Sequence, residues 1–437
     1  MAAPHYPYPF GGLIVPTKEL VGRSFCRRSD PLCAFRPRPL HLNSGFDYPS
    51  GHACCQRSLL APLPAIRVLL SRWLDTRRKD TFANRKIFMD RMNTDALVLP
   101  EGIGAELSQG LCDDPFRWLG MHAGSECVVV RAYLPGIESA EVVLLAADHQ
   151  SVSMQRWTQD AYLFGAVIPG LDAQVPYRLR VNDGAGWSEI EDPYRFPSTL
   201  GPENFASFRA GTDVQLHHWL GAIPMQLFGC PGYRFAVWAP NARRVSVVGD
   251  FNRWDGRRHV MRRHHDAGIW ELFIPERTEV VKLTQGAHYK FEILTPRGEL
   301  LLKADPLGVW HQASPGTASL LAGSLAPVPR RTGSSAARRK PMSIYELHAG
   351  SWRRHVDGRH YTYDELADEL VPYVKDLGFT HIEFMPLAEH PFEGSWGYQP
   401  VGLFAPASRF GAWQALQRLV NRCHDAEIGV IRDWVPG

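Results

Sequence analysis

Residues 389–411 form the stretch of this sequence whose side chains are best suited to chemistry. Trp396, Tyr398 and Gln399 lie close together in it, with further aromatic and acidic residues on either side. Aromatic rings offer flat apolar faces, and the polar groups beside them can hydrogen-bond to hydroxyls, so this composition suits a sugar ligand. The alternative is an ordered structural loop without a ligand, which composition alone does not exclude.

The elements on either side of this stretch predict where it lies. An apolar strand-like run at residues 381–385 precedes it, and a helix-like run at residues 412–425 follows it. Residues 389–411 are therefore expected to be a long loop between a strand and a helix. Parallel α/β proteins build their active sites from loops of this kind.

The whole segment from residue 343 to residue 437 alternates strands with helices. Thr362 and Glu365 form a capping box that predicts a helix start, and Pro372 is expected to kink that helix or to force a local irregularity in it. Right-handed crossovers would place the helices outside a parallel sheet, with Tyr398 and Asp433 together at the carboxyl ends of its strands. The predicted strands are residues 343–348, 381–385 and 427–435.

The middle of the chain repeats itself. Pro135 and Pro240 lie 105 residues apart, Pro169 and Pro275 lie 106 apart, and Asp192 and Asp305 lie 113 apart. Between these landmarks, apolar and polar residues alternate with the period of half-buried antiparallel strands. We therefore expect two tandem immunoglobulin-like β-sandwiches, in modules 105–215 and 216–325, followed by a linker at 326–342. The predicted strands are residues 128–134, 141–145, 163–168 and 177–181, then 233–239, 245–248, 269–274 and 288–294.

One turn in the second module, residues 249–261, carries an aromatic residue among polar ones. Trp254, with Asn252 in the same turn, is a candidate for binding glucose rings. The other interpretation is that Trp254 packs at the edge of the sandwich, because large aromatic side chains contribute strongly to protein cores.

Composition bounds the class of protein. The 437 residues are 45% hydrophobic and 21% charged, as in an ordinary globular chain of about three domains. Residues 1–92 contain 15 Lys and Arg and 6 Asp and Glu, a balance of +9 that leaves −6 for the rest out of the net +3. This balance argues against a nucleic-acid partner for the body of the protein. The sequence contains no apolar run long enough to suggest a membrane span or a membrane partner.

The first 91 residues differ from the rest. They are basic and irregular, and we expect a disordered extension or an incorrectly assigned start upstream of Met92, with an organelle transit peptide as the alternative. Their cysteines and His52 do not follow the usual spacing of a zinc site. We therefore expect no metal and no cofactor, and the scattered cysteines of the chain suggest a reducing cytoplasm. The cysteines of this segment are Cys26, Cys33, Cys54 and Cys55.

Several long motifs resemble those of one enzyme family. SIYELHAGSWRR, FTHIEFMPLAEHPFEGSWGYQPVGLFAPASRFG and GVIRDWVPG resemble segments of the bacterial 1,4-α-glucan (glycogen) branching enzymes of the α-amylase superfamily. YRFAVWAPNARRVSVVGDFNRWDGRRHVM looks like the glucan-binding β-sandwich of that family, and DDPFRWLGMH with EIEDPYRF looks like its extra N-terminal module. The resemblance covers residues 105–437 and implies two β-sandwiches before a (β/α)8 barrel, of which residues 343–437 would be the first three units.

The resemblance also implies a reaction. Branching enzymes of glycogen biosynthesis cleave an α-1,4 glucan segment and transfer it to a 6-hydroxyl, through a retaining mechanism with an Asp nucleophile and a Glu acid/base. Their partner is α-1,4-glucan or glycogen, and they need no cofactor. Tyr398 would lie beside the sugar at the cleavage subsite and Asp433 would bind substrate, with Trp396 and Gln399 nearby.

Two further expectations follow from the resemblance. The nucleophile and acid/base would lie beyond residue 437, so this chain is expected to be inactive alone and poorly ordered over residues 343–437. The alternatives are a non-catalytic glucan-binding protein, a decayed gene fragment, or a subunit completed by a second chain carrying the remaining strands. Glu427 replaces a glycine of the family, and Arg432 replaces an apolar residue, where a buried unpaired charge would cost several kcal/mol.

Overall fold

The computed structural model describes residues 97–124, 127–145, 150–157, 162–171, 173–279, 281–324 and 341–436. The predictions for the basic N-terminal segment lie outside these residues, and so does most of the predicted linker. Within this described part, every helix is either too short or too polar to cross a bilayer.

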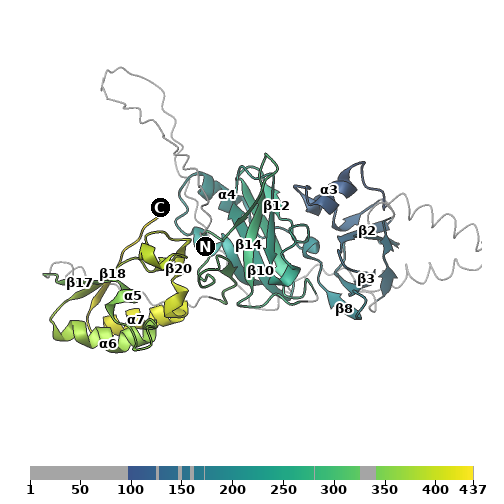
Figure 1. Cartoon of the computed structure of the whole chain (residues 1–437). Coiled ribbons are helices and arrows are strands. Elements are labelled where there is room, and N and C mark those ends of the chain that lie inside the picture. The colour runs from purple at the N-terminus through teal and green to yellow at the C-terminus, as the bar shows by residue number, and fades with distance from the viewer. Residues whose placement is uncertain are drawn as a thin grey trace, which may run out of the picture. The chain divides into compact units, whose positions relative to one another are not determined.

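Antiparallel strands form the first β-rich region (Figure 1). After α3 (Ile103–Gln109) and η2 (Pro115–Arg117) come β1 (Gly120–Ala123), β2 (Cys127–Tyr133), β3 (Ser139–Leu144), β4 (Ser151–Ser153), β5 (Gln155–Arg156), β6 (Leu163–Pro169), β7 (Tyr177–Asn182) and β8 (Trp187–Ile190). One sheet has the order β1-β2-β6-β5 and the other β4-β3-β7-β8. Val130, Phe164 and Leu179, from β2, β6 and β7, share one buried core, so the two sheets pack face to face.

The second β-rich region has the same plan. After η3 (Pro193–Arg195), α4 (Pro202–Arg209) and η4 (Leu216–His218) come β9 (Gly221–Leu227), β10 (Cys230–Trp238), β11 (Arg244–Gly249), η5 (Asp250–Asn252), β12 (Arg262–His264), β13 (Ile269–Pro275), β14 (His288–Leu294), β15 (Leu300–Lys303) and β16 (Ser319–Leu320). The sheets have the orders β12-β13-β10-β9 and β11-β14-β15, and β16 also pairs with β14. Phe235, Trp270 and Phe291 lie in the core between them.

The two regions are structural duplicates of each other. β2 pairs with β6 as β10 pairs with β13, and β3 pairs with β7 as β11 pairs with β14. The strands predicted from the repeat are all present within a few residues of their predicted ends. Alternation of buried and exposed side chains along each strand is the physical source of that pattern.

A buried tyrosine–aspartate pair recurs at the same place in both duplicates, which the sequence pattern did not predict. The Tyr177 hydroxyl donates to Asp192 Oδ2 at 2.5 Å, and the Tyr289 hydroxyl donates to Asp305 Oδ2 at 2.7 Å. Each aspartate also accepts a hydrogen bond from the amide two residues later, both at 2.9 Å. The pair therefore fixes the segment after each sheet to the end of a central strand.

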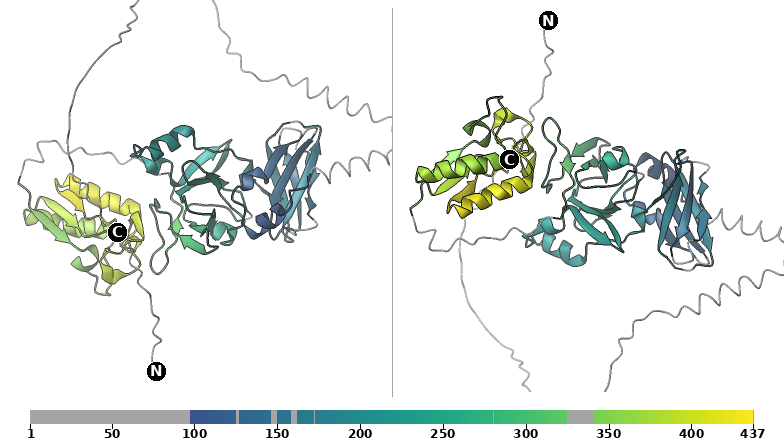
Figure 2. Two further views of the ribbon diagram at one scale, coloured as in Figure 1. Left: turned by 90° about the horizontal axis from the view of Figure 1, so that it is seen from above. Right: turned by 90° about the horizontal axis from the view of Figure 1, so that it is seen from below.

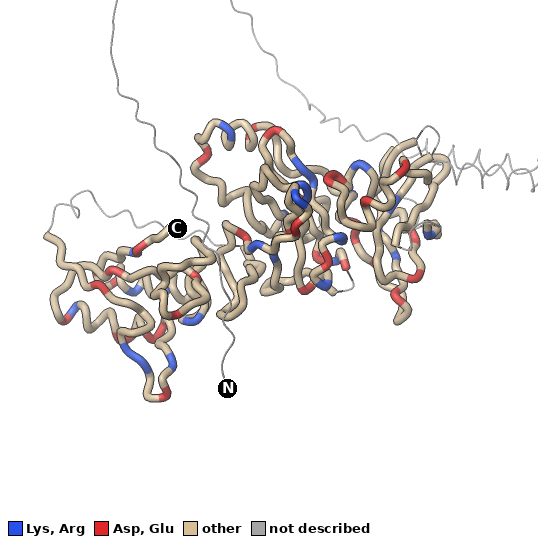
Figure 3. Tube along the Cα trace, turned by 45° about the horizontal axis from the view of Figure 1, so that its top comes forward, with Lys and Arg blue, Asp and Glu red and all other residues tan. Residues whose placement is uncertain are grey.

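Acidic and basic residues are interspersed along the described chain (Figure 3), and some form buried ion pairs. Arg244 in β11 binds Glu292 of β14 at 2.7 Å, and both side chains are largely shielded from solvent. Arg244 also donates to the Ser246 hydroxyl and to the Gly256 carbonyl. This arginine thus connects a strand of the second region to the turn that contains Trp254.

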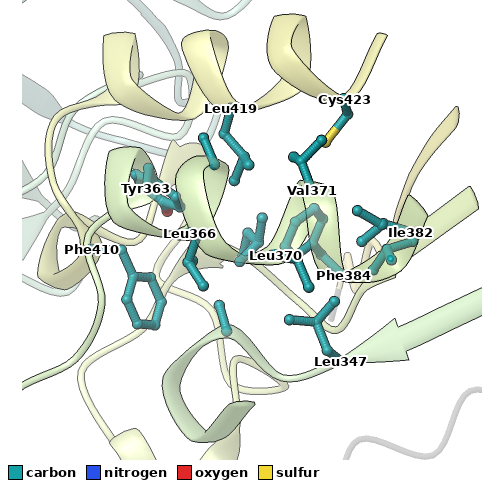
Figure 4. Packing of buried hydrophobic residues seen from close by; sticks show 14 of the residues in the cluster. Leu347, Tyr363, Leu366, Leu370, Val371, Ile382, Phe384, Phe410, Leu419 and Cys423 are labelled. Atoms are coloured by element: carbon teal, nitrogen blue, oxygen red, sulfur yellow. The ribbon is translucent and has the colours of Figure 1, made fainter. Parts of the chain in front are cut away.

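The third region is a parallel three-stranded sheet with helices. Its elements are β17 (Ile344–Leu347), α5 (Ala349–Trp352), α6 (Tyr363–Asp376), β18 (His381–Phe384), β19 (Ala388–Glu389), η7 (Glu393–Ser395), β20 (Gly402–Pro406), η8 (Ser408–Phe410), α7 (Trp413–Asp425) and β21 (Gly429–Arg432). The sheet order is β17-β18-β21, and helices α6 and α7 lie side by side (Figure 2). Leu370, Phe384 and Leu419, from α6, β18 and α7, meet in one buried core (Figure 4).

Helix α6 begins as predicted. The Thr362 hydroxyl accepts from the Glu365 amide at 3.2 Å, and Glu365 Oε2 accepts from the Thr362 amide at 2.7 Å. The helix then runs through Pro372 to Asp376 as one element. Burial of the apolar face of the helix against the sheet holds the helix together despite the missing proline amide.

The structure corrects the expectation for Arg432, in the last strand, and explains the glycine expected at the position of Glu427, just before it. Arg432 is exposed and donates to the Leu403 carbonyl at 3.4 Å, so the expected buried unpaired charge is absent here. The reason is that β21 is an edge strand among the described residues, and Arg432 is its last residue. Glu427 has a φ of 64°, a left-handed conformation that explains why glycine suits this position at the end of α7.

Candidate functional site

Tyr398 and Asp433 meet at the carboxyl end of the parallel sheet. The Tyr398 hydroxyl donates to Asp433 Oδ2 at 3.1 Å, although 35 residues separate the two in sequence. The Asp433 amide donates to the Phe384 carbonyl at 2.9 Å, which holds the aspartate beside the end of β18. Tyr398 is 44% exposed, so the pair is accessible to a ligand.

Two glutamates that sequence reasoning missed lie close to this pair. Glu346 of β17 and Glu383 of β18 are opposite each other in the parallel register. The hydrogen bond to Asp433 raises the pKa of Tyr398, and the charges of Asp433, Glu346 and Glu383 act in the same direction. The phenol therefore stays protonated and able to donate. A carboxylate in the middle of each apolar strand was the signal for these residues, because strands of parallel sheets are usually apolar on both faces.

Trp396 is held in a fixed position next to Tyr398. It has a left-handed φ of 55°, and its ring stacks on His348 with centroids 5.6 Å apart at 25°. The following Gly397 also has a left-handed φ, and a Cβ there would collide with the Pro386 carbonyl, so this tight turn requires glycine. The indole is 53% exposed, which leaves part of it free to contact a ligand.

Ion pairs fix the rest of the loop. Glu393 Oε1 accepts from Arg354 Nη2 at 2.6 Å and lies 3.1 Å from His360 Nε2. At the base of the loop, the buried Glu389 accepts from the Ser408 amide at 2.6 Å. The loop also contains the antiparallel ribbon β19–β20, which the prediction of an irregular stretch did not include. A site presented by a loop fixed in this way is preorganised for binding.

Gln399 differs from its neighbours. Its side chain is exposed beside Tyr398, and among the described residues it forms no hydrogen bond that fixes its orientation. The structure therefore brings Tyr398, Asp433 and Trp396 into defined positions and leaves Gln399 at the rim.

Trp254 lies in a second, separate candidate site. Arg253 and Trp254 both have left-handed φ values, of 57° and 59°, and the indole ring is 38% exposed. Its Nε1 donates to Asp250 Oδ1 at 3.2 Å, and Asp250 Oδ2 accepts from the amide and ring of His288. Burial opposes ionisation of Asp250, but the hydrogen bonds from His288 and Trp254 prevail and lower the pKa of the carboxyl. The strained turn thus holds an aromatic ring at the surface.

Asn252 does not lie where a sugar contact would require. It is 1% exposed, its amide donates to the Val247 carbonyl and to His259 Nδ1, each at 2.8 Å, and its oxygen accepts from the Gly249 amide at 2.9 Å. Burial lowers the pKa of His259 to about 3, so the imidazole is neutral and its Nδ1 can accept. Asn252 therefore shapes the turn from inside, because all of its hydrogen-bonding groups are used within the protein.

The described residues were also compared with the requirements of a metal site, which needs several ligating side chains close together. In the part of the chain that the structure describes, no group of three or more His, Cys, Asp or Glu side chains is placed to bind a metal ion. The first site offers aromatic faces for stacking on Trp396 and Tyr398, and a carboxylate for hydrogen bonding on Asp433.

Comparison with known proteins places these features in a family. Residues 103–194 match the family model "alpha-1,4-glucan branching enzyme GlgB, N-terminal domain", and residues 219–308 match "Carbohydrate-binding module 48 (Isoamylase N-terminal domain)". These matches fall on the two duplicated β-rich regions.

The chain is also similar to curated relatives, each named 1,4-alpha-glucan branching enzyme GlgB. It is 47% identical to that of Cereibacter sphaeroides over 348 residues, which is 78% of this chain and 46% of the relative. It is 49% identical to that of Rubrobacter xylanophilus, over 74% and 44% of the two chains, and 48% identical to that of Pseudomonas aeruginosa, over 76% and 45%.

The similarity to solved structures is weak. The catalytic module of the multi-modular glycogen-degrading pneumococcal virulence factor SpuA matches with a TM-score of 0.36 at 19% identity, over 49% of this chain and 36% of that one. No fold assignment follows from a value this low. The family matches and the curated relatives agree with one another, and the chain spans about half the length of those relatives. The chain belongs to the family of bacterial 1,4-alpha-glucan branching enzymes.

Proposed function

We propose that this chain is part of a 1,4-α-glucan branching enzyme of glycogen biosynthesis, which cleaves an α-1,4-linked segment and transfers it to a 6-hydroxyl. The observation that carries the proposal is the hydrogen bond between Tyr398 and Asp433 at the carboxyl ends of three parallel strands. The curated relatives, which are 47% and 49% identical to this chain over 46% and 44% of their own lengths, are named 1,4-alpha-glucan branching enzymes.

The proposed architecture has four parts, of which the linker lies mostly outside the described residues. Modules 105–215 and 216–325 are immunoglobulin-like β-sandwiches, 326–342 is a linker, and 343–437 supplies the first three units of a (β/α)8 barrel. The face-to-face antiparallel sheets support the first two assignments, and the parallel order β17-β18-β21 with its helices supports the last.

The proposed ligand is an α-1,4-glucan such as glycogen. Tyr398 and Trp396 offer aromatic faces to a glucosyl ring, and the Asp433 carboxylate accepts hydrogen bonds from its hydroxyls. Gln399 adds a flexible polar group at the rim. The pair of catalytic carboxyls of a retaining enzyme, about 5 to 5.5 Å apart, is predicted to lie beyond residue 437. We also propose that a second chain carries the remaining strands of the barrel, and that the protein is located in the cytoplasm.

An iodine-staining assay with amylose tests the proposal. We expect no branching by this chain alone and branching when a polypeptide with the second half of a related enzyme is added. Tyr398→Phe and Asp433→Asn should each reduce that complemented activity, whereas the control Tyr373→Phe, on the outer helix α6, should not. Branching by the chain alone would contradict the prediction about the catalytic carboxyls.

The alternative function, a non-catalytic glucan-binding protein, is favoured by the exposed and strained Trp254. Electrophoresis in gels containing glycogen measures this binding without any reaction. Trp254→Ala should reduce the retardation of the chain, and Trp187→Ala, at another exposed tryptophan, is the matched control. Retardation that is lost with Trp187→Ala and kept with Trp254→Ala would refute the role of Trp254.

A further inference from the structure

Trp396, in the first candidate site, is held in place by the segment that follows β17. Its φ of 55° lies in the left-handed region, which is unfavourable for a bulky residue, and its indole is 53% exposed. A strained and half-exposed residue keeps such a conformation only where its surroundings fix it. Residues 348–360 make two contacts that do so, one to the indole and one to the turn that carries it.

His348 contacts the indole directly. It follows Leu347, the last residue of β17, so it lies at the carboxyl end of the parallel sheet. Its imidazole stacks on the Trp396 ring with centroids 5.6 Å apart and planes 25° apart, and its Nδ1 lies 2.9 Å from the Ser351 hydroxyl. His348 thus covers part of one face of the indole, and the exposed part of the ring remains available to a ligand.

The His348 ring is neutral when it stacks at neutral pH. Burial lowers the pKa of the imidazole below its usual value, and the nearby His390 and His360 act in the same direction. Stacking a neutral ring on the indole requires no burial of a charge. An imidazole at this position therefore supplies an aromatic support and still forms a hydrogen bond with Ser351.

The second contact fixes the turn that carries Trp396. Glu393 begins η7, and its carbonyl accepts from the Trp396 amide at 3.0 Å. The Glu393 carboxylate accepts from Arg354 Nη2 at 2.6 Å and lies 3.1 Å from His360 Nε2. Arg354 and His360 also share the Gly350 carbonyl, each at 3.1 Å, so both are joined to the short helix α5.

Gly350 lies against both histidines. A Cβ on this residue would lie 3.1 Å from His348 Cε1 and 3.3 Å from His360 Cε1, closer than side chains normally pack. The contact to the indole and the contact to the turn therefore come from one compact unit.

We propose that His348 is a positioning residue of the glucan site, whose ring holds the Trp396 indole ready to stack on a glucosyl ring. The contacts of Glu393 fix the turn below the indole. This proposal rests on the proposed function, because it requires that Trp396 contacts glucan. Holding the indole in its bound orientation improves affinity, since the ring does not have to be ordered on binding.

Hydrogen exchange with peptide resolution tests this support without a ligand. In His348→Ala, the amides of residues 393–399 should exchange about three- to tenfold faster, because the aromatic pair is lost. His348→Phe keeps an aromatic ring on the indole and should restore slow exchange. His355→Ala is the matched control, since His355 lies in the same segment and packs on Tyr361 rather than on Trp396, with ring centroids 4.4 Å apart.

Electrophoresis in gels of increasing glycogen concentration measures the effect on binding. All variants carry Trp254→Ala, which removes the aromatic ring of the second candidate site. Trp396→Ala should weaken binding, and His348→Ala should raise the dissociation constant about three- to tenfold. His348→Phe should restore it to within about twofold, while Glu393→Ala should raise it about two- to fivefold. Circular dichroism confirms that each variant is folded.

The results distinguish this proposal from the proposed function. Equal glycogen binding with and without Trp396→Ala would refute the role of Trp396, and with it both the proposed site and the role of His348. If Trp396→Ala weakens binding, unchanged exchange or unchanged binding in His348→Ala would overturn the role of His348 alone. A failure of His348→Phe to restore exchange and binding would do the same.

Discussion

The buried Tyr177–Asp192 pair predicts that the stability of the first β-rich region falls as the pH rises from about 4 to about 6. Asp192 is almost completely buried, and burial raises its pKa from 3.8 to about 6, although Tyr177, the Tyr194 amide and Arg195 act in the opposite direction. The folded state therefore binds this proton more tightly than the unfolded state. That contribution is fully present below pH 3.8 and is lost as the pH rises through about 6.

The size of this effect follows from the two pKa values. The difference between 3.8 and about 6 corresponds to about 3 kcal/mol in the free energy of unfolding. Asp192→Asn removes the ionisation and keeps the shape of the side chain. Its oxygen can still accept from the Tyr194 amide, and its NH₂ can donate to Tyr177, because a tyrosine hydroxyl also accepts. We therefore expect the variant to lack the loss of about 3 kcal/mol that the original chain shows between pH 4 and 7.

Urea unfolding at several pH values measures the difference. Pulsed hydrogen exchange with peptide resolution reads the first region separately, because a chain of several regions does not unfold in two states. Asp305→Asn, in the duplicate pair with Tyr289, should change the pH dependence of the second region in the same direction, since burial also raises the pKa of Asp305. Asp266→Asn, at an exposed aspartate, is the control. Parallel pH profiles for the original chain and Asp192→Asn would refute the reasoning.

Three other predictions concern stability. Arg244→Met should destabilise the second region by about 3–5 kcal/mol in urea unfolding, because it leaves the Glu292 carboxylate shielded and unpaired. Glu427→Gly should raise the stability of the third region by about 1 kcal/mol, measured in the same way, because it relieves a left-handed φ of 64°; no gain would contradict that explanation. In limited proteolysis, residues 343–437 should be cleaved before the β-rich regions, since the sheet face away from the helices carries the exposed Ile344. A resistant core that includes them would contradict this expectation.

The sequence was sufficient to predict the duplicated strands because their signal is local. Alternation of side chains along Tyr233, Phe235 and Val237 reports directly which face is buried, and prolines such as Pro135 and Pro240 mark where pairing ends. The Tyr177–Asp192 pair was not predicted, because it depends on which strand end lies next to which turn.

The candidate site was predicted only in part, because some of its contacts also depend on how segments distant in the sequence pack together. Tyr398 and Asp433 were placed together because the carboxyl ends of parallel strands share one edge of the sheet. The ribbon β19–β20 was missed because β19 has two residues and an irregular register, too short for any periodicity. Glu346 and Glu383 were missed because only the register of the sheet sets them opposite each other.

Comparison of the two duplicated regions shows which features they have in common and which positions differ between them. Both share the same strand pairing and the same tyrosine–aspartate pair, so these features belong to the fold itself. At the outer strand both copies expose a large apolar residue, Trp187 in one and Leu300 in the other. They differ at the next two positions, where Ser188 and Glu189 stand in one copy and Leu301 and Leu302 in the other. The strand pairing therefore accepts either polar or apolar side chains at these two positions.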